Sequence, residues 1–509
     1  MVKANMEWDD IVYLVLLLFS IGIGYVFRQI EDKETRKWLS SGLGFLLVLI
    51  VSGKHIMHPI ICTAINAFII LATDRRKCHI VSFFFTFAYL FFFRTTQYFG
   101  IPYPPAHTNM IQMIVTLKVA GLAFEVHNTA AAAKEKEHDD SAAFAKLEAA
   151  EVHPSFQDVF HYTFCYIGIM TGPYYTYRTY RDWLEYPFLL SAPCKDATIQ
   201  KMKYVPLYAV LFVIASTIFP LKYAESEEFY NERSVFYRIW YINPTFFIFR
   251  MRLYTGMVLS ECVCTMAGLG AYPEFTAPSA GHGPTKEFGK LKEIASNNLL
   301  AKEEKYNFET IHNVDPYGSE FVPTFRNGMK CWNMCIQYWL AVNVYKRLAR
   351  NQFRPLITMT ISAIWHGVYI GYYLCLMSAP MYLPVEDVYI KIRKDATGLE
   401  AKFWDFFLWF FKMQAFSYMA IVFLLLHIEL TFKYWSSVYF AGHIVAIILF
   451  VSGKSSGKII LGPGKYKNWT VLFHSALLAV GPVRSIFMSI RFGSGTFPKL
   501  SAEYLRLKS

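Results

Sequence analysis

Residues 356–380 form the stretch that most constrains how this chain can fold. They read LITMTISAIWHGVYIGYYLCLMSAP, an apolar run without Asp, Glu, Lys or Arg and with His366 near its middle. At about 1.5 Å per residue, a helix over this run can span a hydrocarbon core of about 30 Å. A histidine near the centre of such a span is costly unless it faces a protein interior or a water-filled cavity. The run therefore predicts a membrane helix whose histidine serves a function.

The composition of the whole chain agrees with a membrane protein. Only 17% of the 509 residues are charged, while 54% are hydrophobic and 18% aromatic. Soluble domains carry about a quarter charged residues. The 50 Lys and Arg against 38 Asp and Glu give a net charge of +12. In a membrane protein such an excess gathers in cytoplasmic loops and at lipid headgroups, so nucleic acid is not an expected partner.

Further apolar runs predict an all-α polytopic membrane protein with about eleven membrane-embedded helices, some of them tilted, broken or re-entrant because several runs are shorter than a full span. The runs besides 356–380 are 11–27, 42–53, 59–73, 81–93, 110–126, 160–175, 205–221, 236–249, 257–269, 406–428, 439–451 and 471–488.

We predict one multi-pass domain without a separate soluble module. Its parts are N-terminal helices over 1–127, a polar loop in the cytosol over 128–155, core helices over 156–488 and a tail over 489–509.

Four histidines lie in apolar surroundings, namely His366, His427, His443 and His474. Two features favour His366 as the functional one. Gly367 and Gly371 follow it in a small-xxx-small pattern that allows close approach of another helix. Trp365 precedes it and is a candidate wall of a binding pocket. The alternative is that the glycines only pack helices and that His366 binds a backbone carbonyl.

Asn333 and Gln337 are the second candidate pair. A helical pattern begins at Met329 and would place both amides on one helix face. A carboxamide donates two hydrogen bonds and accepts at its oxygen, which suits a carbonyl or hydroxyl substrate. Trp332 lies beside Asn333 as a candidate substrate contact. The alternative is that Asn333 caps or bridges helices.

Basic residues gather just before the His366 run, at Lys346, Arg347, Arg350 and Arg354. Such clusters usually anchor a chain at the cytoplasmic side of a membrane. The alternative is a site for a phosphorylated ligand presented from the cytosol.

Arg178 and Arg181 follow a Gly168–Gly172 pair within a tyrosine-rich stretch, which is typical of the headgroup level. Glu261 is a carboxylate in an apolar run, and we expect Arg250 or Arg252 to pair with it.

The nine cysteines show no zinc-binding spacing, so we expect buried thiols and no metal.

The Trp332–Asn333 pair and the later Trp365–His366–Gly367 sequence resemble the membrane-bound O-acyltransferase (MBOAT) family. The similarity extends through residues 166–183, 249–273 and 313–345, and is greatest to the lysophosphatidylinositol acyltransferases of that family. The resemblance implies a helix bundle that encloses a catalytic chamber, with His366 and Asn333 as the catalytic residues. It implies acyl-CoA as co-substrate, no permanently bound cofactor and a lysophospholipid acceptor. It also implies a role in Lands-cycle remodelling in the endoplasmic reticulum membrane, with arachidonoyl as an expected acyl group.

The residue types suit this chemistry. A positioned imidazole can take the proton of a lipid hydroxyl, and a thioester already carries a good leaving group. Asn333 would orient the hydroxyl or stabilise charge on the thioester oxygen. Lys346, Arg347, Arg350 and Arg354 are then candidates for CoA phosphates, and Arg178 and Arg181 for an anionic headgroup.

Three alternatives stay open at this point. The first is another lysophospholipid acceptor, with a choline, serine or ethanolamine headgroup. The second is a protein acceptor, and the third is a multi-pass transporter, although we find no inverted repeats. The oligomeric state also stays open.

Overall fold

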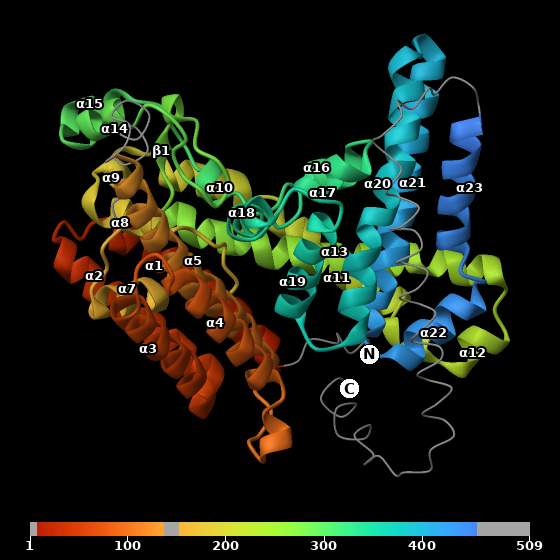
Figure 1. Ribbon diagram of the computed structural model, residues 1–509, viewed down its shortest axis with the longest axis horizontal. Coiled ribbons are helices and arrows are strands. Elements are labelled where there is room, and N and C mark those ends of the chain that lie inside the picture. Colours follow the sequence, from red (N-terminus) through yellow and green to blue (C-terminus); the bar gives the residue numbers. More distant parts are fainter. Residues whose placement is uncertain (1–7, 137–151, 456–509) are drawn as a thin grey trace.

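The computed structural model describes residues 8–136 and 152–455, which fold almost entirely into helices (Figure 1). The predicted run 471–488, His474 and the tail 489–509 lie outside the described residues. Helix α5 continues into the predicted polar loop as far as Lys136, and residues 137–151 of that loop are not described. On the far side of the loop, Arg75 Nη1 donates to His153 Nδ1 over 3.0 Å.

The N-terminal helices form the left lobe in Figure 1. Asp32 caps α2 by accepting from Thr35 N at 2.7 Å, which satisfies one of the free amides of the first turn. The elements are α1 (Trp8–Phe27), α2 (Lys33–Ser52), η1 (Gly53–Ile56), α3 (Met57–Ala72), α4 (Cys78–Arg94), η2 (Thr96–Phe99) and α5 (Ala106–Lys136). The prediction of separate crossings over 42–53 and 59–73 is wrong, because Lys33–Ala72 is one continuous helical stretch.

The middle of the chain is built around one long helix. Its elements are α7 (Phe156–Phe164), α8 (Tyr177–Glu185), α9 (Phe188–Ser191), α10 (Cys194–Met202), α11 (Val205–Ile218), η3 (Leu221–Glu225), α12 (Glu227–Asn231) and α13 (Val235–Ala267). The runs 236–249 and 257–269 were predicted as two spans, but both belong to α13. The charged residues between them are accommodated because Arg250 pairs with Glu320 at 2.6 Å and Arg252 with Asp10 at 3.4 Å.

The predicted helix over 160–175 is also wrong beyond Phe164, where α7 ends. Gly168 and Gly172 have φ of +77° and +91°, which L side chains rarely adopt. These glycines therefore allow an irregular backbone and do not form a helix-packing stripe.

The polar stretch after α13 forms short helices and one small two-stranded sheet. It contains β1 (Tyr272–Pro273), η4 (Glu274–Thr276), α14 (Phe288–Ala295), α15 (Asn298–Glu303), β2 (Tyr306–Asn307), η5 (Glu309–Ile311), α16 (Pro316–Phe321), α17 (Phe325–Lys330), α18 (Met334–Asn343) and η6 (Tyr345–Arg347). Strands β1 and β2 pair antiparallel, with Tyr272 opposite Asn307.

The C-terminal lobe comprises α19 (Arg354–His366), α20 (Ile370–Asp395), α21 (Gly398–Leu425), α22 (Ile428–Ser437) and α23 (Ala441–Ser455). The central prediction of one helix over 356–380 is wrong. Helix α19 ends at His366, and α20 begins at Ile370. His366 therefore lies at a helix end and not inside a helix.

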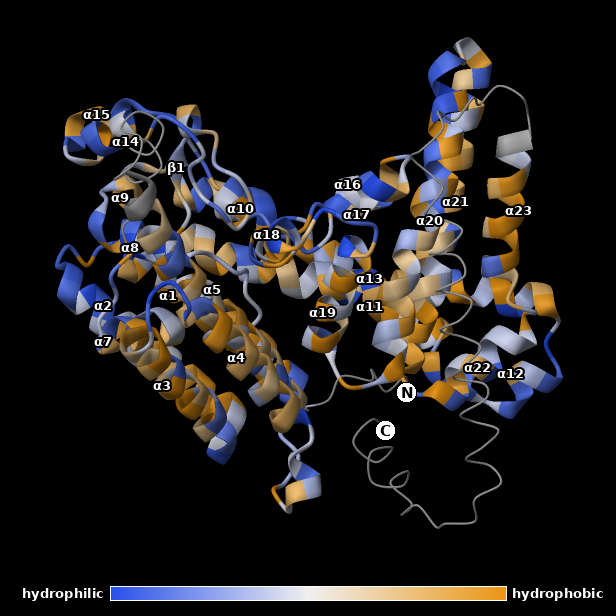
Figure 2. Ribbon diagram, in the orientation of Figure 1, coloured by the Kyte–Doolittle hydropathy of each residue, from blue (hydrophilic) through white to orange (hydrophobic). Residues whose placement is uncertain are grey.

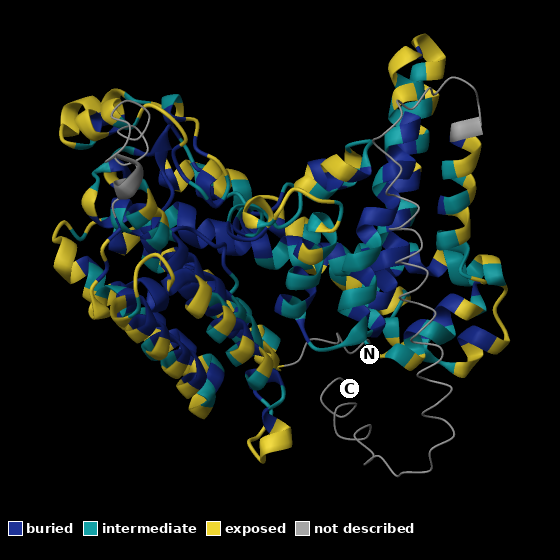
Figure 3. Cartoon of the chain, in the orientation of Figure 1, coloured by how far each residue is buried: buried dark blue, intermediate teal, exposed yellow. Residues whose placement is uncertain are grey.

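Three apolar cores hold the lobes together. One packs α1–α3 against the second half of α13, and another packs α20–α22 against its first half, so α13 bridges both (Figure 3). The third core joins α4 and α5 to the two segments that carry the candidate site. It contains Cys335, Ile336 and Trp339 of α18 and Trp365 of α19.

Several helices are strongly hydrophobic (Figure 2), and many of their large apolar side chains are exposed, as suits contact with lipid. Phe68 of α3 and Phe84 of α4 are 67% and 68% exposed, and Val205 is the one buried residue of α11. Within the described ranges, five helical stretches are long and apolar enough to cross a membrane, or six if α22 and α23 form one bent span.

Candidate active site

Asn333 occupies a left-handed turn directly before α18. Its φ and ψ are 51° and 45°, a conformation that asparagine tolerates better than most residues. It is therefore the N-cap of α18 and does not lie on the same helix as Gln337, so the prediction of a shared helix face is wrong. Its side chain makes no capping hydrogen bond to α18. The carboxamide is partly exposed and has no hydrogen-bond partner among the described residues.

His366 lies at the C-terminal end of α19. Its partly buried ring contacts Trp365, Tyr372 and Phe423, with ring centroids at 4.9, 5.9 and 5.1 Å. No hydrogen bond holds the imidazole within the part of the chain that the structure describes. The alternative that His366 binds a backbone carbonyl is therefore not what the structure shows, and both ring nitrogens are available to a substrate.

The break after His366 is set by close packing around two glycines. Gly367 has extended backbone, and a Cβ there would lie 2.3 Å from the Tyr372 ring. Gly371 N donates to Leu426 O, and a Cβ at Gly371 would lie 2.2 Å from Val422 O. Gly371 thus allows the close approach of α20 to the end of α21, which confirms the expected role for this glycine alone.

An arginine that the sequence did not single out holds this helix end. Arg94, the last residue of α4, is only 5% exposed. Its guanidinium donates to Ile364 O at 2.9 Å, to Trp365 O at 2.7 Å and to Asn109 Oδ1 at 2.9 Å. A cation that satisfies the last carbonyls of a helix stabilises the helix end. The only signal in the sequence was an arginine after the apolar run 81–93, which is also typical of a membrane anchor.

Aromatic rings connect the two candidate catalytic residues. Trp332, beside Asn333, lies 6.4 Å from the Phe249 ring, which lies 5.8 Å from Phe423, whose ring contacts His366. Phe249 comes from α13 and Phe423 from α21. A chain of ring contacts, which we call the aromatic wall, therefore runs from Trp332, the sequence neighbour of Asn333, to His366.

Two of the predicted substrate contacts serve the fold. Trp365 is buried, and its Nε1 donates to Met113 O of α5 at 3.1 Å. Gln337 Nε2 donates to the carbonyls of Met329 and Trp332, which fixes the turn before Asn333. The Trp365 indole N–H and the Gln337 Nε2 amide are thus both bound to backbone carbonyls, which fixes the position of these two side chains.

The basic residues lie between the two catalytic segments, around η6. Arg347 donates to Asn128 Oδ1 of α5 at 2.6 Å, and its guanidinium lies 4.7 Å from the Phe124 ring. Arg354 lies over the Tyr345 ring at 3.9 Å. Lys346 and Arg350 are exposed. The cluster is thus present on the surface, and the guanidiniums of Arg347 and Arg354 stack on aromatic rings.

Arg178 and Arg181 lie on α8, away from η6 in the sequence and half-buried. The first turn of α8 is held by Glu125 of α5, which accepts from Tyr177 N at 2.8 Å and from Arg178 N at 3.1 Å. Arg178 lies 3.7 Å from Asp182 and 4.7 Å from the Phe288 ring.

The other histidines have structural neighbours. His443 Nδ1 lies 3.0 Å from Tyr418 Oη in a hydrogen bond, and His427 precedes α22 with its ring against Tyr369 at 5.1 Å.

Glu261 has a different partner from the one predicted. The expected pairs with Arg250 or Arg252 are wrong, because Glu261 Oε2 contacts Lys201 Nζ at 2.5 Å.

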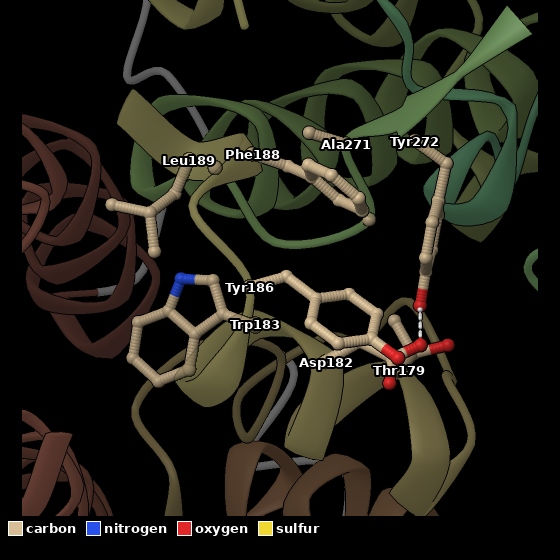
Figure 4. Close-up of a pocket in the computed structure, with 10 residues that line it drawn as sticks. Thr179, Asp182, Trp183, Tyr186, Phe188, Leu189, Ala271 and Tyr272 are labelled. Atoms are coloured by element: carbon tan, nitrogen blue, oxygen red, sulfur yellow. Dashed lines mark hydrogen bonds between the residues drawn. The ribbon is translucent and has the colours of Figure 1, made fainter. Parts of the chain in front are cut away.

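A small pocket, with room for about one water molecule, lies elsewhere, between α8, α9 and the segment that follows α13 (Figure 4). Tyr186, Phe188 and Tyr272 line it, together with the Asp182 carboxylate, which accepts from Tyr272 Oη at 2.6 Å. It contains neither candidate catalytic residue.

Two further observations concern metals and thiols. Among the residues with described positions, no group of three or more His, Cys, Asp or Glu side chains is arranged to hold a metal ion. All nine cysteines are free, and eight of them are buried.

Comparison with known proteins identifies the family of this chain. The model of the membrane-bound O-acyltransferase family, MBOAT, matches residues 101–428. The chain is 45% identical over 457 residues to a membrane-bound acylglycerophosphatidylinositol O-acyltransferase, frj, of Drosophila melanogaster, covering 86% of this chain and 91% of that one. The protein of the same description from Xenopus laevis, mboat7, is 38% identical over 88% of this chain and 94% of its own, and the Homo sapiens protein, MBOAT7, is 36% identical over 89% and 94%.

The chain therefore belongs to the membrane-bound O-acyltransferase family and is a multi-pass integral membrane O-acyltransferase. This confirms the family resemblance and the all-α membrane fold that the sequence predicted.

Removing Arg94 is expected to lower turnover more than stability alone explains. In Arg94→Met the carbonyls of Ile364 and Trp365 lose their donors. An unsatisfied buried group costs about 1–3 kcal/mol, which corresponds to about 5- to 150-fold in rate if it displaces the candidate base His366. We expect that fall in kcat, measured on purified enzyme.

Arg36 offers a matched control. It is also buried and donates to backbone carbonyls, those of Ile30, Trp183 and Leu184, away from His366. Arg36→Met should lower the thermal unfolding temperature and leave kcat near that of the unmodified enzyme. Equal kcat losses in both variants would show that Arg94 only stabilises the fold.

Proposed function

We propose that this enzyme transfers a fatty acyl group from acyl-CoA to the free sn-2 hydroxyl of lysophosphatidylinositol. The acceptor is proposed because the relatives above are described as acylglycerophosphatidylinositol O-acyltransferases. The observation that carries the chemistry is the unpaired His366 imidazole, which the aromatic wall links to Trp332, directly before Asn333 and its unpaired carboxamide.

In the proposed reaction His366 acts as general base. The imidazole takes the proton of the sn-2 hydroxyl while that oxygen attacks the thioester carbonyl. The C–S bond then breaks, and the imidazolium returns the proton to the departing CoA sulfur. No covalent acyl-enzyme is required because the thioester already has a good leaving group. The rings of Phe249, Phe423 and Tyr372 exclude water, which protects the thioester from hydrolysis.

Asn333 is proposed to act on the reacting oxygens. Its two N–H donors and its carbonyl oxygen are unused by the fold, so the group can donate to the thioester oxygen or accept from the sn-2 hydroxyl. Arg94 and Gln337 are proposed as positioning residues, because each acts on backbone next to a catalytic residue.

The charged ends of both substrates have candidate partners. We propose Lys346, Arg347, Arg350 and Arg354 for the CoA phosphates, since they gather at the N-terminal side of the helix that ends at His366. We propose Arg178 and Arg181 for the anionic headgroup. An arachidonoyl preference, residence in the endoplasmic reticulum and a role in Lands-cycle remodelling complete the proposal.

A competition assay tests the acceptor. The purified enzyme receives labelled arachidonoyl-CoA and equal amounts of lysolipids with inositol, choline, serine and ethanolamine headgroups. We expect most label in phosphatidylinositol. Preferential labelling of another headgroup would replace the proposed acceptor, and label in none, with flux of a solute across proteoliposomes, would instead indicate a transporter.

A further inference from the structure

The N-terminus of α18 lacks the cap that its sequence leads one to expect. Asparagine is among the best N-cap residues, and its side-chain oxygen normally accepts from the second or third amide of the helix. Asn333 is the N-cap here, yet its side chain accepts from neither. A helix end that is left unsatisfied is costly, so another group has to supply the acceptors.

Asn313 supplies them from a distant part of the chain. Its Oδ1 accepts from Cys335 N, the second amide of α18, at 3.2 Å. Its backbone oxygen accepts from Met334 N, the first amide, at 2.7 Å. Asn313 is only 4% exposed, so no water replaces it readily.

Asn313 is itself held by a buried ion pair. Glu261 Oε1 of α13 accepts from Asn313 N at 2.8 Å and from Val314 N at 3.0 Å. Glu261 Oε2 contacts Lys201 Nζ of α10 at 2.5 Å. Glu261 therefore fixes the backbone of Asn313 to α13, and Lys201 of α10 in turn holds Glu261. Through its hydrogen bonds to Met334 N and Cys335 N, Asn313 then fixes the start of α18.

We propose that Asn313 is a positioning residue that takes over the capping role of Asn333 and so leaves the Asn333 carboxamide free for the reacting oxygens. The inference rests on the catalytic role proposed for Asn333. If Asn333 capped its own helix, its oxygen would be bound to Cys335 N and unavailable to a substrate. Asn313 thus caps α18, a role that the N-cap asparagine usually fills itself, and Asn333 is left for the reaction.

The test compares Asn313→Ala with Asn313→Asp. Alanine removes the Oδ1 acceptor, so Asn333 either swings to cap α18 or loses its position. Misplacement by about 1 Å can cost about a hundredfold in rate, so we expect kcat to fall at least about tenfold, with KM for both substrates nearly unchanged. Aspartate keeps the acceptor, and we expect it to restore most of kcat.

Asn297→Ala is the matched control, because Asn297 Oδ1 caps α15 by accepting from Leu299 N and Leu300 N, outside the site. It should lose stability to a similar degree and keep kcat. The inference is overturned if Asn313→Ala keeps kcat while Asn333→Ala loses it, or if Asn297→Ala loses kcat as Asn313→Ala does. If Asn333→Ala itself keeps kcat, the proposed catalytic role fails first.

Discussion

Replacing His366 by alanine is expected to lower the rate of acyl transfer to lysophosphatidylinositol by about 10²–10⁴-fold, the usual contribution of a positioned general base. The imidazole has no hydrogen-bond partner among the described residues and lies beside the rings of Tyr372 and Phe423. Its removal should therefore lower the turnover number and change the free energy of unfolding little. Turnover of arachidonoyl-CoA by the purified variant measures the effect. His366→Gln, which can hydrogen-bond but cannot act as a base at neutral pH, should be equally impaired.

His443 is the control for this variant. It is also a histidine among apolar helices, but it binds Tyr418 and packs against Trp435 with ring centroids at 4.8 Å. His443→Ala should alter stability and retain kcat. Near-normal turnover in His366→Ala would refute the catalytic assignment, whatever the control does.

The second large effect is expected at Asn333, where loss of the carboxamide should lower kcat by about 10²–10³-fold, as for an oxyanion donor. Asn333→Asp separates the two possible roles. Aspartate keeps an acceptor for the sn-2 hydroxyl and loses the donor to the thioester oxygen. Residual activity in Asn333→Asp well above that of Asn333→Ala would indicate orientation of the hydroxyl, and equal loss would indicate stabilisation of the thioester oxygen.

Glycine at this position controls for the backbone. Asn333 has a positive φ, which alanine adopts only with strain and glycine adopts freely. Asn333→Gly thus removes the carboxamide and leaves the turn unstrained. If it keeps the rate of the unmodified enzyme while alanine does not, the asparagine serves the backbone and not the reaction.

The sequence located the candidate catalytic residues better than the elements that carry them. Polar groups in apolar surroundings are costly, which drew attention to four histidines, and the resemblance to the family then singled out Asn333 and His366. Arg94 did not stand out, because an arginine after an apolar run is common. Its role depends on two carbonyls that lie about 270 positions later in the chain, as the separations of 270 and 271 in its hydrogen bonds show. Asn313 likewise gave no signal, because its partners are backbone amides of α18.

The errors in the expected helices have one physical cause. Hydropathy measures how apolar a run is, and it does not report where its backbone hydrogen bonds go. The run 356–380 is apolar throughout, yet the helix stops at His366. Arg94 donates hydrogen bonds to the last carbonyls of this helix, and Gly371 packs against α21. Conversely, α13 continues through charged residues because Glu320 and Asp10 neutralise Arg250 and Arg252.

The sequence by itself determined the membrane class, because composition follows from residue types alone, and its resemblance to the family indicated the pair of polar residues proposed for the chemistry. Only the tertiary structure decided that His366 ends a helix, that Asn333 begins one without capping it, and that Arg94 and Asn313 hold these two ends. Those facts depend on which donors and acceptors meet across the bundle, and a buried helix end is stable only where such partners meet.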